Sequence, residues 1–186
     1  MLLNVVDNIY WIQTYTGKRF DLLNPDVDMI CLNDIARPLS KLCRYTGQTD
    51  KFYSVAEHSI HVSNLLSSDL ALYGLLHDAA EAYIGDIAKP FKDILNLLTG
   101  GQVSHIEHKI HRVILEHFGI DPDYNNDAVK TADMFMLVSE HNKLLKPKLH
   151  WPQDSEYIDL SIPLYCWDSD IACDNFIDMF TNMISR

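Results

Sequence analysis

The sequence predicts a single all-α domain of about six or seven helices, with a small β-hairpin at its N-terminal end. Apolar residues recur every three or four positions through most of the chain, which is the spacing of amphipathic helices. Glycine and proline interrupt this pattern where helices end or begin. A length of 186 residues allows one domain with a sizeable core, so we expect residues 1–186 to fold as one unit.

Residues 9–23 are rich in aromatic and β-branched side chains, a composition typical of a short hairpin. Asn24-Pro25 ends this segment, and residues 1–32 are therefore expected to form an N-terminal extension. The aromatic side chains of the hairpin either pack beneath it or form a lid or base-stacking wall: Trp11, Tyr15 and Phe20.

Helices are expected over about residues 34–45, 54–66, 70–82, 88–99, 102–118, 125–145 and 169–183. Asn33 or Asp34 caps the first of them, which carries Arg44 near its end. Ser54 and Glu57 have the spacing of a capping box at the start of the second. These caps set where each helix begins.

Residues 146–167 form a surface arm that contains three prolines together with large aromatic residues, among them Trp151, Tyr157 and Trp167. The arm is too apolar to be disordered. We expect it to contact a second copy of the chain in a homo-oligomer. Asp168 or Asp170 then caps the last helix.

The net charge of −11 makes a groove-binding role on long nucleic acid improbable, because such a surface repels phosphates. A small anionic substrate needs only a local cationic site. The four cysteines form no CxxC pair, which is typical of reduced thiols in a cytoplasmic protein. No stretch has the character of a signal peptide or a membrane span.

The segment 75–86 begins with apolar residues yet carries four ionisable side chains: His77, Asp78, Glu81 and Asp86. Ionisable groups are rarely buried without a partner, and a divalent metal ion suits imidazole and carboxylate together. A mononuclear site needs further ligands from other elements. His58 and Asp133, each on a separate expected helix, are the candidates.

Two imidazoles and two carboxylates favour Mn²⁺, Fe²⁺, Co²⁺, Ni²⁺ or Zn²⁺ over Mg²⁺ or Ca²⁺, which prefer shells made only of oxygen. One ion of the first group is therefore the expected cofactor. The 102–118 helix carries three more histidines, which we interpret as solvated: His105, His108 and His111.

The ordered set His58…His77-Asp78…Asp133 resembles the metal ligands of the HD-domain phosphohydrolases. Matching segments lie at 54–59, 77–86 and 129–133, and the likeness covers roughly residues 33–145. It is nearest to the small single-domain branch, the 5′-deoxynucleotidases and phage dATP triphosphohydrolases. The connection between the first two histidines is shorter here than in the deoxynucleotidases.

The resemblance implies that these four residues hold one metal ion. It also implies that Glu81 acts on the attacking water or the leaving oxygen. Asp86 would lie against the sugar 3′-hydroxyl and leave little room for a 2′-hydroxyl. Arg44 and Tyr45 match an Arg-Trp pair that contacts phosphate and sugar or base, with a one-residue gap and Tyr in place of Trp. Lys130 is a further phosphate-binding candidate.

The positions of the residues agree with these roles. Glu81 follows Asp78 by three residues and His77 by four, so on a helix all three share one face. A carboxylate at that place can take a proton from water whose pKa a metal has lowered. A nearby cation such as Arg44 can offset charge on the phosphate.

We therefore expect hydrolysis of a deoxynucleotide at its 5′ phosphoester. Basic residues expected near the site favour a triphosphate over a monophosphate substrate: Arg19, Arg37, Lys41, Lys89 and Lys130. Hydrolysis of cyclic or bis-phosphorylated nucleotides is one alternative. A non-catalytic nucleotide sensor is another, although such a module has no need of a general base such as Glu81.

Overall fold

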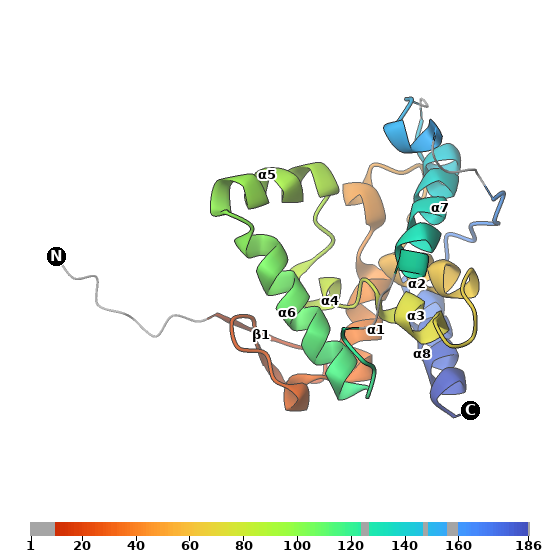
Figure 1. Ribbon diagram of the computed structural model, residues 1–186. Helices are drawn as coiled ribbons and strands as arrows, with labels where there is room; N and C mark the ends of the chain where they lie inside the picture. The colour runs from red at the N-terminus through yellow and green to blue at the C-terminus, as the bar shows by residue number, and fades with distance from the viewer. Residues whose placement is uncertain (1–9, 124–126, 147–148, 156–159, 186) are drawn as a thin grey trace.

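The structure is a computed structural model that describes residues 10–123, 127–146, 149–155 and 160–185, and it is mostly helical (Figure 1). The helices are α1 (Leu32–Lys41), α2 (Val55–Asn64), α3 (Ala71–Leu76), α4 (Glu81–Ile84), α5 (Lys89–Thr99), α6 (Gln102–His117), α7 (Asp127–Leu144) and α8 (Ser169–Ile184). Short 3-10 helices are η1 (Val27–Met29), η2 (Arg44–Gly47) and η3 (Pro152–Ser155). Strands β1 (Trp11–Gln13) and β2 (Arg19–Asp21) pair antiparallel. The predicted fold class, all-α with a small N-terminal hairpin, is confirmed.

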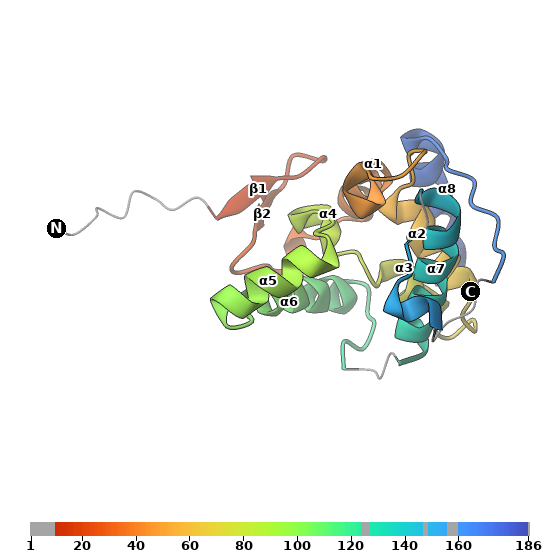
Figure 2. The same ribbon diagram turned by 90° about the horizontal axis from the view of Figure 1, so that it is seen from above.

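Helix α2 is the centre of the larger group of helices and contacts α1, α3, α7 and α8. Every one of its residues from Val55 to Ser63 is buried. Helices α5 and α6 lie beside each other on the opposite side of the molecule (Figure 2). Because α2 buries polar as well as apolar side chains, each of its ionisable groups needs a partner from a neighbouring element.

The hairpin packs onto the helices through Phe20, whose ring stacks on Tyr83 at 3.8 Å. Its turn is held by Asp34, which accepts hydrogen bonds from the backbone N–H of Thr16 at 2.7 Å and from its hydroxyl at 2.6 Å. Asp34 is therefore a buried tertiary partner, and the N-cap of α1 is Cys31, so the predicted cap was wrong. Residues 1–9 of the predicted extension, Asn125 and Tyr157 lie outside the described residues.

The first predicted helix was expected to reach Tyr45, but α1 ends at Lys41. The backbone becomes extended at Leu42 and forms a β-bridge between Cys43 and Ser54. The N–H of Arg44 then donates to the carbonyl of Tyr53 at 2.9 Å. Arg44 accordingly lies beyond the helix, because this pairing satisfies its backbone in another way.

The predicted 70–82 helix is divided into α3 and α4 by a tighter turn. There the N–H of Ala79 bonds the carbonyl of Leu76 and that of Glu81 bonds the carbonyl of Asp78, each three residues back, at 3.0 Å. A ring nitrogen of His77 donates to the carbonyl of Gly74 at 2.8 Å, and so occupies an acceptor that a continuous helix would use for Asp78. Gly85, with φ of 83°, ends α4 as predicted.

The capping box is half confirmed. The Ser54 hydroxyl accepts from the N–H of Glu57 at 3.1 Å, as expected of an N-cap. The Glu57 carboxylate, however, accepts three backbone N–H groups from the arm, at 2.7 Å from Tyr165, 2.9 Å from Cys166 and 2.8 Å from Trp167. This fully buried carboxylate therefore ties the arm to α2.

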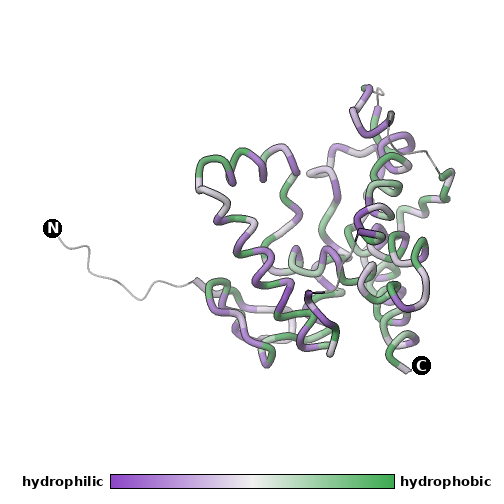
Figure 3. Tube along the Cα trace, viewed as in Figure 1, coloured by the Kyte–Doolittle hydropathy of each residue, from purple (hydrophilic) through white to green (hydrophobic). Residues whose placement is uncertain are grey.

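The last helix begins as predicted, with the Asp168 carboxylate accepting from the N–H groups of Asp170 and Ile171. All four cysteines are free. The hydropathy of the described helices changes every few residues (Figure 3), and none is both long and apolar enough for a membrane span.

We predict that Glu57→Gln lowers the free energy of unfolding by about 2–4 kcal/mol, because an amide group cannot accept all three buried N–H bonds. Urea denaturation followed by circular dichroism measures this change. Glu116→Gln is the matched control, since Glu116 pairs with Arg112 at the surface, where such a pair contributes about 0.5 kcal/mol or less. Equal stability of the two variants would contradict the role assigned to Glu57.

Candidate metal centre

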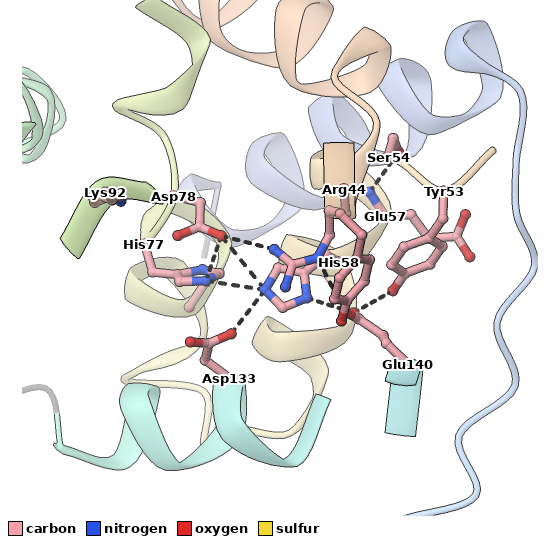
Figure 4. Close-up of polar contacts among 12 residues, drawn as sticks. Arg44, Tyr53, Ser54, Glu57, His58, His77, Asp78, Lys92, Asp133 and Glu140 are labelled. Carbon is pink, nitrogen blue, oxygen red and sulfur yellow. Dashed lines mark hydrogen bonds and ion pairs between the residues drawn. The ribbon is translucent and has the colours of Figure 1, made fainter. Parts of the chain in front are cut away.

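His58 is fully buried in α2, and its Nε2 atom is the point on which the predicted ligands converge (Figure 4). Nε2 lies 3.3 Å from Nε2 of His77 and 3.1 Å from Oδ1 of Asp133. Oδ2 of Asp78 lies 3.0 Å from the His77 nitrogen and 3.6 Å from the His58 nitrogen. Helix α2, the turn after α3 and helix α7 thus bring all four predicted side chains together.

The hydrogen bonds of the two rings suit a metal ion. Nδ1 of His58 faces a carboxylate oxygen of Glu140 at 2.7 Å, and Nδ1 of His77 faces the Gly74 carbonyl. Both partners accept, so each Nδ1 carries the proton of a neutral ring. The two Nε2 lone pairs then face each other at 3.3 Å and repel unless a proton or a metal ion lies between them. One ion at about 2.1 Å from each nitrogen meets this need.

The nearby carboxylates also favour positive charge at this point. Burial and the charge of Arg44 lower the pKa of His58, but Glu140 and Asp133 outweigh them and raise it to about 9. Burial opposes a low pKa for Asp78, yet the His77 ring holds that pKa well below its ordinary value. Protons and a metal ion therefore compete for the same ligand atoms.

Glu140 is a residue of the site that sequence analysis missed. It lies seven residues after Asp133 on α7, so both carboxylates project from one face of that helix. Together they bracket the His58 ring, Asp133 at Nε2 and Glu140 at Nδ1. The seven-residue spacing was the available signal, but a buried carboxylate on a helix rich in polar residues gives no distinctive pattern.

Glu140 also accepts hydrogen bonds from residues that precede α2 in the chain. Its Oε1 atom accepts from the Tyr53 hydroxyl at 2.8 Å, and its Oε2 atom accepts from the Tyr45 hydroxyl at 2.7 Å and from Nε of Arg44 at 3.1 Å. Burial alone would raise the pKa of Glu140, but Arg44 and His58 lower it to about 2. One buried carboxylate therefore joins His58 to both members of the predicted Arg-Tyr pair.

The backbone at this pair is strained. Tyr45 and the next residue, Thr46, have φ values of 56° and 52°, in the left-handed region. Side chains with a Cβ adopt it at a cost of about 1–2 kcal/mol each. The hydrogen bond from Tyr45 to Glu140 holds this conformation and directs the tyrosine to the wall of a cavity.

A cavity of about 670 Å³ opens beside the four ligands, a size typical of small-molecule sites. Six predicted site residues line it: Arg44, Tyr45, Asp78, Glu81, Asp86 and Asp133. The remaining wall comes from the start of α5, from α7 and from η3, and includes Lys89, Lys92, Met134, Leu137, Leu145 and Trp151. The cavity thus has ionisable groups near the ligands and apolar groups further along α7.

Glu81 is buried in the wall of this cavity and is 7% exposed. Its Oε2 atom makes no hydrogen bond within the described part of the chain. Burial, and then the negative charges of Asp78 and Asp86, raise the pKa of Glu81 well above its ordinary value. Burial likewise raises the pKa of Asp86. A raised pKa makes a carboxylate a stronger base than one at the surface.

Lys130 is not among the residues that line the cavity. Its ammonium group lies at the surface and pairs with Asp127 at 3.4 Å. Lys92, in contrast, was not among the predicted site residues but lines the cavity, and it pairs with Glu107 at 2.7 Å. Lys130 follows Asp127 by three residues, so a neighbour on its own helix already satisfies its charge.

The remaining histidines lie away from the metal site. His105 and His108 are exposed, as predicted, whereas His111 is half-buried and its ring donates to the carbonyl of Leu76 at 3.0 Å. His61 is buried between Glu57 and the aromatic residues of the arm. Within the described residues, one group of three or more His, Cys, Asp or Glu side chains is close enough to hold a metal: His58, His77 and Asp133.

No protein-family model matches the chain. Two curated proteins are similar to it. The uncharacterized protein YfdR of Escherichia coli K12 is 39% identical over 143 residues, which are 76% of this chain and 77% of that protein. An uncharacterized protein of Rhodobacter capsulatus is 33% identical over 135 residues, 66% of this chain and 67% of that protein.

We predict that Glu140→Gln weakens binding of Mn²⁺ or Co²⁺ about 10–100-fold, because loss of the carboxylate leaves the His58 ring without its charged partner. Isothermal titration calorimetry on the folded variant measures the affinity. Tyr53→Phe is the control, since it removes one hydrogen bond to Glu140 but leaves the carboxylate against His58. Undiminished metal affinity in Glu140→Gln would rule out this orienting role.

Proposed function

The chain belongs to the family of Escherichia coli YfdR, and we propose that it is a metal-dependent phosphohydrolase of the HD-domain type. The proposed substrate is a deoxynucleotide, cleaved at its 5′ phosphoester. The observation that carries this proposal is the meeting of three features in one place. A cluster of two imidazoles and two carboxylates adjoins a nucleotide-sized cavity, and the buried Glu81 faces the same cavity.

The ligand set would hold one divalent transition metal through His58, His77, Asp78 and Asp133. Such an ion, when bound, supplies Lewis-acid chemistry that lowers the pKa of water and polarises a phosphoryl oxygen. The protein's part is to fix the four ligands and to keep both histidines in the tautomer that presents Nε2. The bonds from His58 to Glu140 and from His77 to Gly74 support that part.

Glu81 is the proposed general base. It accepts a proton from the attacking water as the water oxygen forms its bond to phosphorus. The bond between phosphorus and the 5′-oxygen breaks, and the proton passes to that oxygen as it leaves. The products are the deoxynucleoside and the free phosphate group. The burial of Glu81 and its raised pKa suit a group that takes up and returns a proton.

Arg44 and Asp86 are the proposed substrate contacts. The Arg44 guanidinium lies 3.6 Å from Asp78 and lines the cavity, where it can offset negative charge on the phosphate. Asp86 lines the same cavity, and its carboxylate suits the sugar 3′-hydroxyl. The resemblance to the single-domain HD enzymes supports both assignments.

The basic residues around the cavity favour a monophosphate substrate over the triphosphate that the sequence suggested. Of the five basic residues behind that expectation, only Lys89 lines the cavity. Its charge and that of Lys92 are already paired, with Asp93 and Glu107 at 2.7 Å each. A triphosphate carries more negative charge than these few cations can offset, and the observation therefore favours the smaller anion.

We predict that Glu81→Gln retains metal binding but loses about 10²–10⁴-fold in kcat, because the amide cannot accept a proton. Phosphate release from 2′-deoxynucleoside monophosphates with Mn²⁺ gives kcat, and calorimetry gives the metal affinity. Asp133→Ala is the contrasting variant and should lose the metal as well as turnover. Full activity of Glu81→Gln would exclude the general-base assignment.

We predict that deoxynucleoside monophosphates are hydrolysed roughly 10-fold or more faster than the matching ribonucleotides, because Asp86 leaves little space at the 2′ position. A panel of dNMPs, dNTPs and rNMPs, with phosphate and triphosphate measured separately, tests both selectivities. In Asp86→Ala the ratio of deoxy to ribo rates should fall toward one. Triphosphate release from dNTPs at rates above those for dNMPs would reverse the substrate assignment.

A further inference from the structure

The arm places Trp151 in the wall of the cavity that also contains the metal ligands. The aromatic residues of the hairpin, the sequence-based candidates for a stacking wall, do not line this cavity. Phe20 is buried against Tyr83, Trp11 lies under Arg19, and Tyr15 lies under Arg37. Within the described residues, the aromatic wall of the cavity is therefore Trp151 with Tyr45.

The Trp151 indole is held in a fixed position. One face stacks on the ring of His141 at 4.0 Å, with the planes 6° apart. His141 is 2% exposed and contacts Oδ1 of Asp154 at 3.2 Å, while Oδ2 of Asp154 accepts from the backbone N–H of Trp151 at 2.7 Å. The same carboxylate thus holds the His141 ring and the backbone of Trp151, and the stack on His141 orients the indole before a ligand binds.

The position of Trp151 relative to the metal site suits an elongated ligand. His141 lies eight residues beyond Asp133 on α7, which is about 12 Å along the helix axis. Between them the cavity wall is apolar, with Met134 and Leu137. The Tyr45 ring lies 6.3 Å from the Trp151 ring at an angle of 46° and forms the adjacent wall. The polar end therefore suits a phosphate, and the far end suits a flat aromatic group.

We propose that Trp151 is the platform on which the nucleobase of the substrate stacks, with Tyr45 as the neighbouring wall. His141 covers one face of the indole, and the other face is the one offered to the base. This inference rests on the proposed phosphohydrolase function and adds the base-binding subsite to it. Stacking on an aromatic ring accepts every base, because each base has a π-face, so the site distinguishes nucleotides from other phosphate esters more than one base from another.

The test compares a substrate that has a base with one that lacks it. With Mn²⁺, Trp151→Ala should raise KM for 2′-deoxyadenosine 5′-monophosphate by roughly 10-fold or more and change kcat little. It should leave kcat/KM for 2-deoxyribose 5-phosphate as in the wild type. Trp151→Phe keeps a ring at the same place and should retain most of the affinity. Trp11→Ala, in the hairpin, is the matched control and should affect neither substrate.

The possible outcomes distinguish failure of the base-binding role of Trp151 from failure of the proposed phosphohydrolase function. Equal losses on both substrates in the Trp151 variants would mean that the indole only maintains the shape of the cavity, and would overturn the base-binding role alone. Unchanged KM for the nucleotide in Trp151→Ala would overturn it too. A wild-type protein that hydrolyses neither substrate would overturn the proposed function and the platform with it.

Discussion

Both ring nitrogens of His58 are engaged by carboxylates of a single helix, and the candidate site depends on this arrangement. Asp133 reaches Nε2 and Glu140 reaches Nδ1, so α7 fixes the orientation and the tautomer of a ring that α2 buries completely. A buried imidazole without these partners would be costly. The packing of α7 against α2 is therefore stabilised by the same contacts that orient the His58 ring, a candidate metal ligand.

The contacts of Glu140 extend the arrangement to the cavity. Arg44 and Tyr45 lie outside any α-helix, in a strained turn, and their side chains are held by the carboxylate that holds His58. The strain is local and the hydrogen bonds that offset it are buried, a combination that is common where a side chain must keep one position. The proposed metal ligand and the proposed substrate contacts consequently share one rigid support.

The two halves of the arm, residues 146–167, make different contacts. Its second half is bound by three N–H groups to Glu57 on α2, and its first half places Trp151 against His141 and the cavity. We expected the arm to form an interface with another copy of the chain, but Trp151 and Trp167 both contact this chain itself. Assembly into an oligomer stays a prediction.

The sequence by itself determined the helical class and the hairpin, because apolar periodicity and residue type are local properties. Their order and helical context also predicted a shared site for His58, His77, Asp78 and Asp133. The structure brings these side chains together, and that they hold a metal stays a prediction. Only the tertiary structure decided the break after α3, the displacement of Arg44 from α1, and the roles of Glu140 and Trp151. The roles of Glu140 and Arg44 depend on partners far away in the chain, since Glu140 contacts both His58 and Arg44. The role of Trp151 depends on its stack with His141 on another element and on the cavity. A pattern along the chain does not encode such partners, because they become neighbours only when the helices pack.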